Sequence, residues 1–377
     1  MTLLETLLIK GILGIAFLGG VLNLAGLLTW VERKQSAVMQ DRIGANRAWI
    51  TFKSPLLRPV NWLLSPLNKL GLFHALADAV KMFAKEDFMP RGADKVLFNI
   101  APLISVTFAL AAFAAIPFGD VLAVGGKVIN LQVADINVGI LFVFAMMSLG
   151  IYGVILAGFS SNNNYAYLGG MRAASQMLSY EITMGISVMG AVLAYGTLSL
   201  QEMVHAQGHY FFGWIPAWGF LIQPLGGIIF MTAALAETKR VPFDLPEGES
   251  EIIGYFVEYS GMKFGMFFLT DLVETVLVAC LVTTFYFGGW QVPFLFRDGF
   301  LFPWGGSLAL PQWAVAALQI LSFMTKVAVL NWFFMAIRWT LPRFRYDQLM
   351  KLGWKILFPL SLLNVLITSI VVVMTSK

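Results

Sequence analysis

Residues 264–287, FGMFFLTDLVETVLVACLVTTFYF, form an apolar stretch long enough to cross a membrane. At 1.5 Å per residue, about 20 helical residues span a hydrocarbon core about 30 Å thick. The stretch lacks the strict alternation of apolar and polar residues that a barrel strand requires. It therefore predicts a transmembrane helix, and it carries two acidic residues, Asp271 and Glu274, where charge is costly.

Seven further stretches of the same kind occupy the rest of the chain, at about 7–30, 96–118, 137–158, 182–200, 218–236, 313–335 and 355–375. Of the 377 residues, 58% are hydrophobic and 12% are charged, whereas about 25% are charged in a soluble domain. The sequence thus predicts an all-α polytopic membrane protein of about eight transmembrane helices. We expect a single membrane domain over 1–377.

Lys and Arg are concentrated in alternate loops. The predicted inner loops, at about 31–95, 159–181, 237–263 and 336–354, hold 20 of these residues with their flanks, against Lys127 and Arg297 in the outer loops. This asymmetry predicts that the charged loops are cytoplasmic and that both termini lie outside. It also explains the net charge of +4 without nucleic acid. Short apolar runs in the first inner loop predict one or two amphipathic helices along the inner surface.

Residues that bind metals are scarce. The single cysteine, Cys280, cannot supply the thiolates of an iron–sulfur cluster. His205 and His209 have helical spacing, but a glycine lies between them and no third ligand is near. We favour a solvated loop there and expect no metal or cluster in this chain.

The fifth loop, ALAETKRVPFDLPEGESEIIGYFVEYSGMKFG (234–265), contains six carboxylates among apolar and aromatic residues: Glu237, Asp244, Glu247, Glu249, Glu251 and Glu258. An ordinary solvated acidic loop is one interpretation. However, crowded carboxylates in a low dielectric raise one another's pKa, so such a cluster could hold and pass protons. Glu181, predicted to open the fourth helix, and Lys326, inside the seventh, add charge to apolar segments. We favour a proton relay over mere neutralisation of Lys326 by a carboxylate.

The acidic loop and four other stretches carry a family resemblance. The others are VERKQSAVMQDRIGANRA, ADAVKMFAKEDFMPRGADKVLFNIAP, GFSSNNNYAYLGGMRAASQMLSYEITM and RWTLPRFRYDQLMKLGWKILFPL, in that order along the chain. Together they resemble the H subunit of NADH-quinone oxidoreductase, respiratory complex I. Because they fall at every inner loop, the resemblance covers nearly the whole chain.

The resemblance implies a subunit that is not catalytic alone but forms the quinone-binding tunnel in a bacterial inner membrane. The quinone tail would enter between the first and sixth helices and the first amphipathic helix. The implied partners are hydrophilic-arm subunits, which hold FMN and the terminal iron–sulfur cluster, and small and antiporter-like membrane subunits. Quinone reduction would shift the coupled carboxylate pKa values and drive proton translocation.

The resemblance also implies roles for individual residues. The acidic proton path would comprise Glu181, Glu237, Glu249, Glu251 and Asp271, the last standing where glutamate is common. Charged residues of the quinone tunnel would be Glu32, Arg33, Arg42, Arg240, Asp244 and Glu247. We assign docking or structural roles first to Arg172, Arg343, Arg345 and Asp347.

The chain departs from the family pattern at several positions. Gly44-Ala45-Asn46 replaces Gly-Pro-Asn, Lys239 replaces asparagine, and about 15–20 extra residues lie between Arg47 and His74. Two other functions remain open. One is the equivalent subunit of an energy-converting hydrogenase or of a dehydrogenase with another donor, and the other is a stand-alone proton-coupled transporter.

Overall fold

The computed structural model describes residues 3–54, 58–124, 127–211, 213–245, 248, 254–297 and 299–375. Its helices are α1 (Leu3–Met39), α2 (Arg58–Leu70), α3 (Phe73–Ala84), α4 (Lys95–Ala111), α5 (Gly139–Ser160), α6 (Asn164–Tyr195), α7 (Leu200–Ala206), α8 (Gly219–Ile222), α9 (Pro224–Glu237), α10 (Gly261–Tyr286), α11 (Gln312–Thr340), α12 (Tyr346–Lys351) and α13 (Phe358–Thr375). A 3-10 turn, Ala112–Ala115, extends α4, and a π turn, Leu352–Leu357, joins α12 to α13.

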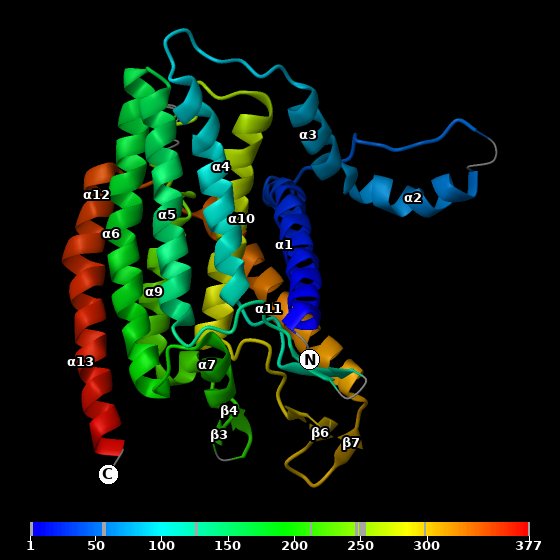
Figure 1. Cartoon of the computed structure of the whole chain (residues 1–377), viewed down its shortest axis with the longest axis vertical. Helices are drawn as coiled ribbons and strands as arrows, with labels where there is room; N and C mark the ends of the chain where they lie inside the picture. The colour runs from blue at the N-terminus through cyan, green and yellow to red at the C-terminus, as the bar shows by residue number, and fades with distance from the viewer. Residues whose placement is uncertain are drawn as a thin grey trace.

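Short antiparallel strands cap one end of the helical bundle (Figure 1). They are β1 (Val121–Val124) with β2 (Lys127–Asn130), β3 (Tyr210–Phe211) with β4 (Ile215–Pro216), and β5 (Leu295–Phe296), β6 (Gly299–Leu301) and β7 (Ser307–Ala309) in one sheet. The start of α1 and the end of α13 lie toward this end (Figure 1). We call the opposite end, where α1 and α11 finish and α6 and α10 begin, the charged end.

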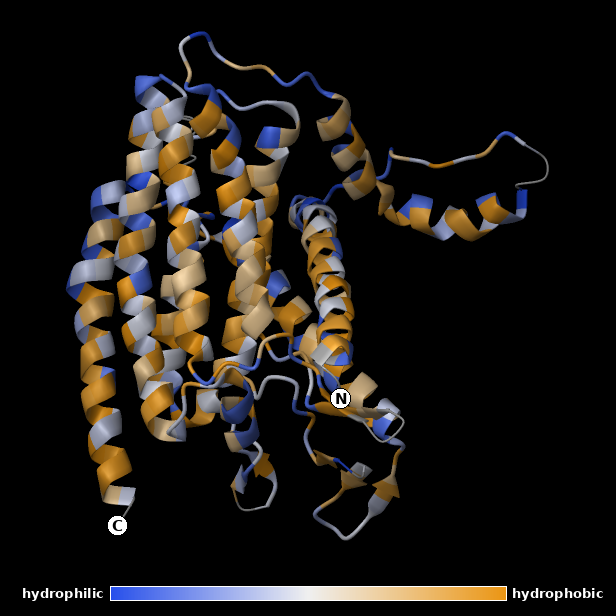
Figure 2. Ribbon diagram, in the orientation of Figure 1, coloured by the Kyte–Doolittle hydropathy of each residue, from blue (hydrophilic) through white to orange (hydrophobic). Residues whose placement is uncertain are grey.

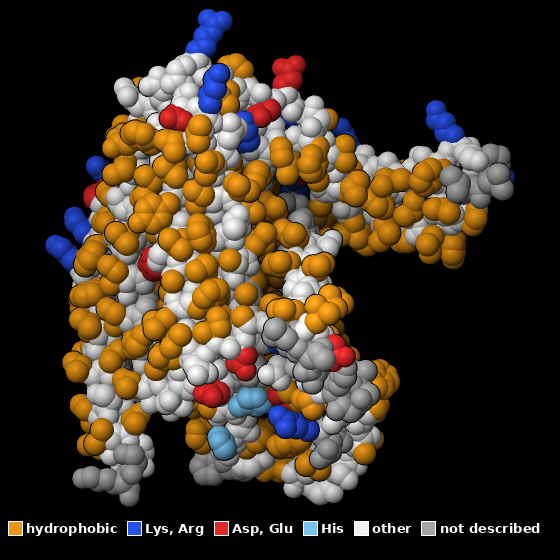
Figure 3. Space-filling view, viewed as in Figure 1, with side chains coloured by type: hydrophobic (Ala, Val, Ile, Leu, Met, Phe, Trp, Pro, Cys, Tyr) orange, Lys and Arg blue, Asp and Glu red, His pale blue; other side chains and the backbone are white. Residues whose placement is uncertain are grey.

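Among the described residues, seven helices are long and apolar enough to cross a membrane: Leu7–Met39, Lys95–Ala115, Gly139–Ser160, Asn164–Tyr195, Gly261–Tyr286, Gln312–Thr340 and Tyr346–Thr375. This confirms the predicted all-α polytopic architecture. Hydrophobic residues dominate the middle of the bundle (Figure 2) and cover its visible flank (Figure 3). Such a surface suits contact with lipid tails.

The predicted fifth helix, 218–236, is broken into two pieces. Gln223, with φ −132° and ψ 60°, interrupts the helix between α8 and α9, and Pro224 cannot donate the backbone hydrogen bond that would repair it. The 14 residues of α9 reach about 21 Å, less than the bilayer core. Gln223 donates to Thr368 (2.6 Å) and accepts from Asn364 (3.0 Å), so α13 stabilises the break.

Helix α10 is the central element. Every residue from Thr270 to Tyr286 is buried, because α10 contacts α1, α4, α9 and α11. Small residues bring other helices close: a Cβ on Gly153 of α5 would lie 2.8 Å from the Ala101 carbonyl of α4, as is common between membrane helices. The apolar stretch 264–287 therefore lies at the centre of the bundle.

Several helices continue past the predicted membrane boundary at the charged end. α1 runs to Met39, and α6 begins at Asn164 rather than near 182. Glu181 therefore lies inside α6, and the prediction that it opens the helix is wrong. Hydropathy detects only the segment in hydrocarbon, whereas backbone hydrogen bonding carries a helix on into water.

Candidate functional site

The charged ends of α1, α3 and α10 enclose a cavity of about 250 Å³. Its lining includes Arg33 of α1, Asp78 and Met82 of α3, and Phe264 and Phe268 of α10. Arg33 Nη2 and Asp78 Oδ2 lie 2.5 Å apart and join α1 to α3. An ion pair beside an apolar wall suits a ligand with a polar head and an apolar body.

Next to Arg33, Glu32 connects three segments. Its carboxylate contacts Arg338 Nη1 of α11 at 2.6 Å and Arg240 Nη1, which follows α9, at 3.5 Å. The Glu32 and Arg240 side chains are only 16% and 10% exposed. Charges so shielded from water need partners, so this group fixes the segment after α9 against α1 and α11.

Asp244 lies on the same segment. The Gln176 amide of α6 holds the backbone by donating to the carbonyls of Ala236 and Phe243, each at 2.7 Å. Asp244 Oδ2 accepts a hydrogen bond from Arg343 Nη2 at 2.9 Å. Burial raises the pKa of Asp244 above its ordinary value, although Arg343 opposes the shift. This carboxyl therefore titrates closer to neutrality than an exposed aspartate.

Lys239 lies among buried acidic residues inside the bundle. Its side chain is 1% exposed, and Nζ lies 2.8 Å from Asp271 Oδ1 and 3.5 Å from Glu274 Oε2. Both carboxylates come from one face of α10, as their spacing of three predicts. Burial alone would lower the pKa of Lys239, but the two carboxylates outweigh it and hold that pKa well above its ordinary value. The ammonium is therefore charged.

Glu237, at the end of α9, is 2% exposed, and neither carboxylate oxygen has a hydrogen-bond partner among the described residues. It interacts electrostatically with Glu181, Glu274 and Lys239. Glu181 in turn accepts a hydrogen bond from the Ser148 hydroxyl of α5. A buried carboxyl without a partner can hold a proton or bind water.

These groups form a series from the cavity edge to α6. Asp244 interacts electrostatically with Asp271, and Glu274 interacts electrostatically with Arg240. These two interactions join the ion pairs near the cavity to the buried ion pairs of Lys239. In order, the series contains Arg33, Glu32, Arg240, Asp244, Asp271, Lys239, Glu274, Glu237 and Glu181. Six of the eleven residues predicted for the tunnel and the proton path thus interact as one group, and a seventh, Arg33, follows Glu32 in the chain and pairs with Asp78 at the cavity.

The remaining four predicted residues lie elsewhere. Glu247, Glu249 and Glu251 are outside the described residues, so their roles stay predictions. Arg42 is exposed, and its side chain donates to nearby Gln40 and Ser36 rather than to the acidic series.

Sequence reasoning missed three members of the site. The sequence contained an indication that Lys239 belongs to the site, because this residue departs from the family pattern beside Glu237. Asp78 and Arg338 had none, since spacing along the chain does not show that α3 and α11 meet α1.

Other polar groups lie away from this series. Lys326 donates to the backbone carbonyls of Phe287 (2.9 Å), Gly289 (2.9 Å) and Gln291 (2.7 Å), and no carboxylate pairs with it within the described segments. The structure therefore does not show the less favoured interpretation, in which a carboxylate neutralises Lys326. His205 lies on α7 rather than in a loop, with Nε2 3.3 Å from Asp120 Oδ1. In the part of the chain that the structure describes, no three residues are placed to bind a metal.

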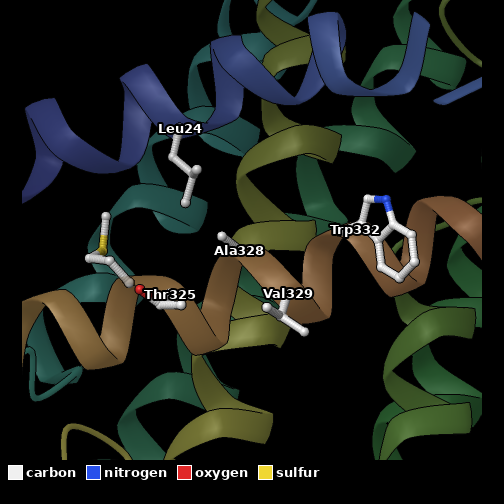
Figure 4. A pocket seen from close by; sticks show the side chains of 6 residues that line it. Leu24, Thr325, Ala328, Val329 and Trp332 are labelled. Atoms are coloured by element: carbon white, nitrogen blue, oxygen red, sulfur yellow. The ribbon is translucent and has the colours of Figure 1, made fainter. Parts of the chain in front are cut away.

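A second hollow, of about 480 Å³, lies between α1 and α11 (Figure 4). Leu24, Met324, Thr325, Ala328, Val329 and Trp332 line it. It contains no titratable side chain, so it suits an acyl chain or an apolar helix and not acid–base chemistry.

The fold and the site define a polytopic helical membrane protein with a buried acid–base series that begins at an amphiphilic cavity. The family model for NADH dehydrogenase matches residues 12–369. A Cytophaga hutchinsonii protein, named as an H subunit of NADH-quinone oxidoreductase, is 43% identical over 97% of this chain and 96% of its own length. The H subunit of the Thermomicrobium roseum enzyme is 40% identical, over 97% of each chain. The chain belongs to this family, the H subunits of NADH-quinone oxidoreductase.

Proposed function

We propose that this chain is the membrane subunit of a proton-pumping NADH-quinone oxidoreductase that forms the quinone site and the start of the proton path. One observation carries the proposal: a buried series of paired charges begins at the cavity formed by α1, α3 and α10. The cavity offers the quinone an apolar wall and polar groups, and the series offers a route for charge into the bundle.

Each part has a role in this function. Phe264 and Phe268 would contact the quinone tail, and Arg33, Glu32 and Arg240 would line the route of the head group. Asp244, whose raised pKa favours proton exchange near neutrality, would respond to the charge of the reduced quinone. Asp271, Glu237 and Glu181 would carry the response toward the antiporter-like subunits.

The assembly follows from the same proposal. Electrons would arrive from hydrophilic-arm subunits that hold the FMN and iron–sulfur clusters, docked at the charged end. That end would face the cytoplasm of a bacterium and both termini would lie outside, as the Lys and Arg distribution favours. The Arg172 guanidinium lies 5.8 Å from the ring of Tyr346, which supports a structural role for it at this surface.

Filling the cavity tests the quinone assignment. Met82→Trp enlarges a side chain that lines the cavity and packs against Gly265. Val80→Trp adds the same bulk on the exposed side of α3, where Val80 is 58% exposed. Steady-state kinetics of the assembled enzyme should show KM for quinone raised roughly tenfold in Met82→Trp only, the effect of about 1.4 kcal/mol of lost binding. NADH oxidation by an acceptor upstream of the quinone should not change. Equal KM values in both variants would refute the assignment.

A further inference from the structure

Lys239 has a backbone conformation that its residue type does not explain. It follows α9 with φ +54°, in the left-handed region that asparagine and glycine adopt most readily. The family pattern has asparagine here, whereas this chain has a long cationic side chain. Since the backbone gains nothing from lysine, the reason for lysine must lie in the contacts of its ammonium.

Those contacts are specific. Nζ lies 2.8 Å from Asp271 and 3.5 Å from Glu274, and the ring of Tyr255 is 5.8 Å away. The long side chain at 239 thus reaches a short carboxylate at 271.

Charged and titratable groups that interact with Lys239 are Asp271 and Glu274 on α10, Glu237 on α9, and Tyr255. One step further out, Glu181 on α6 interacts with Glu237, and Arg240 interacts with Glu274 and Glu32. Asp271 has the shorter contact with the ammonium, Glu274 the longer one, and Glu237 has no hydrogen-bond partner among the described residues. The three carboxyls thus have three different environments.

We propose that Lys239 is a positioning residue of the proton path: it holds Asp271 as a fixed anion, so that Glu274 and Glu237 are the groups that exchange the proton with Glu181. This inference rests on the proposed function. Lys239 lies five residues before Asp244, on the segment that the Glu32 and Arg343 ion pairs fix at the cavity side. A displacement of that segment would change the distance of the ammonium from Glu274, its longer contact, while the shorter contact with Asp271 is kept.

Two substitutions in the assembled complex test the pairing. Lys239→Asn suits the left-handed backbone, so it should assemble normally. It removes the ammonium that pairs with Asp271 and Glu274, and it should lower proton translocation per assembled complex at least about tenfold, because a buried charge that has lost its partner is costly. The double variant Lys239→Asn with Asp271→Asn removes the anion together with its cation and should recover most of the translocation.

Wild-type translocation in Lys239→Asn would overturn the proposal. So would a double variant no better than Lys239→Asn, because the two residues would then not be a matched pair. Glu237→Gln, measured in parallel, separates this inference from the proposed function. If Glu237→Gln stops translocation while Lys239→Asn does not, only the role of Lys239 fails; if Glu237→Gln also translocates normally, the proton path itself fails.

Discussion

Two buried aspartates show how neighbouring side chains decide whether the pKa of a carboxyl rises or falls in this protein. Asp244 and Asp120 are 5% and 4% exposed, and each pairs with an arginine. Burial raises the pKa of Asp244 because Arg343 only partly offsets the lost hydration. Burial also acts on Asp120, but contacts with His205 and Arg297 outweigh it and lower that pKa. Asp244 thus suits proton exchange, whereas Asp120 suits a permanent ion pair.

Asp244→Asn should lower the quinone-reductase rate of the assembled enzyme about tenfold or more, through loss of a charged hydrogen bond worth roughly 1.5–3 kcal/mol. In the wild type, the Asp244–Arg343 pair is lost as pH falls through the raised pKa of Asp244. The rate of the wild type should therefore fall as the pH is lowered, and the rate of the variant should fall less. Asp347→Asn removes the exposed pair with Arg345 and is the matched control. Equal losses in both variants would contradict a specific role for Asp244.

The Asp120 pair should stabilise the end of the bundle that carries the strands. Because the folded-state pKa lies below the ordinary value of 3.8, the stabilisation is fully present above that value and is lost as pH falls below it. Asp120→Asn should accelerate amide hydrogen exchange in 199–211 about fivefold at pH 7, corresponding to about 1 kcal/mol. Glu202→Gln, on the exposed side of α7, should have little effect. If exchange in Asp120→Asn matched the wild type, the pair would not stabilise this region.

At the scale of elements, α2 is the most distinctive helix, because it extends away from the bundle as an arm (Figure 1). It occupies part of the extra stretch between Arg47 and His74. Asn61 and Asn68 bind the backbone of Phe52 and Ile50, which covers its polar side. The apolar side has no partner in the described part of the chain and consists of Val60, Leu63, Leu64, Leu67 and Leu70.

We expect α2 to lie on the bilayer surface with that apolar side in the lipid, as its segregated faces favour. Figure 3 shows hydrophobic side chains along the underside of the arm. Since Cys280 is buried, single cysteines can carry spin labels with little background. A label at Leu63→Cys should be relaxed by oxygen dissolved in lipid, and one at Lys69→Cys, an exposed position away from the apolar side, by a water-soluble relaxing agent. Identical accessibility at both sites would exclude this orientation.

At the scale of the whole molecule, the sequence predicts those helices that depend on a local pattern of apolar residues. Long apolar runs identify α1, α4, α5, α6, α10, α11 and α13. The break at Gln223 was missed because it depends on Asn364 and Thr368, 141 and 145 residues away. The same holds for the site. Its carboxylates could be predicted from family motifs. The ion pairs Arg33–Asp78 and Glu32–Arg338 could not, because they form only when α3 and α11 pack against α1.

The proposed function requires that the cavity at α1, α3 and α10 receives the quinone and opens onto the charged series. A cryo-electron-microscopy map of the assembled complex with a bound quinone analogue tests this requirement. We expect tail density between Phe264 and Phe268 of α10 and the Met82 side of α3, with the head group approaching Arg33, Glu32 and Arg240. Density confined to the apolar hollow between α1 and α11, with the α3 cavity filled by side chains, would contradict it.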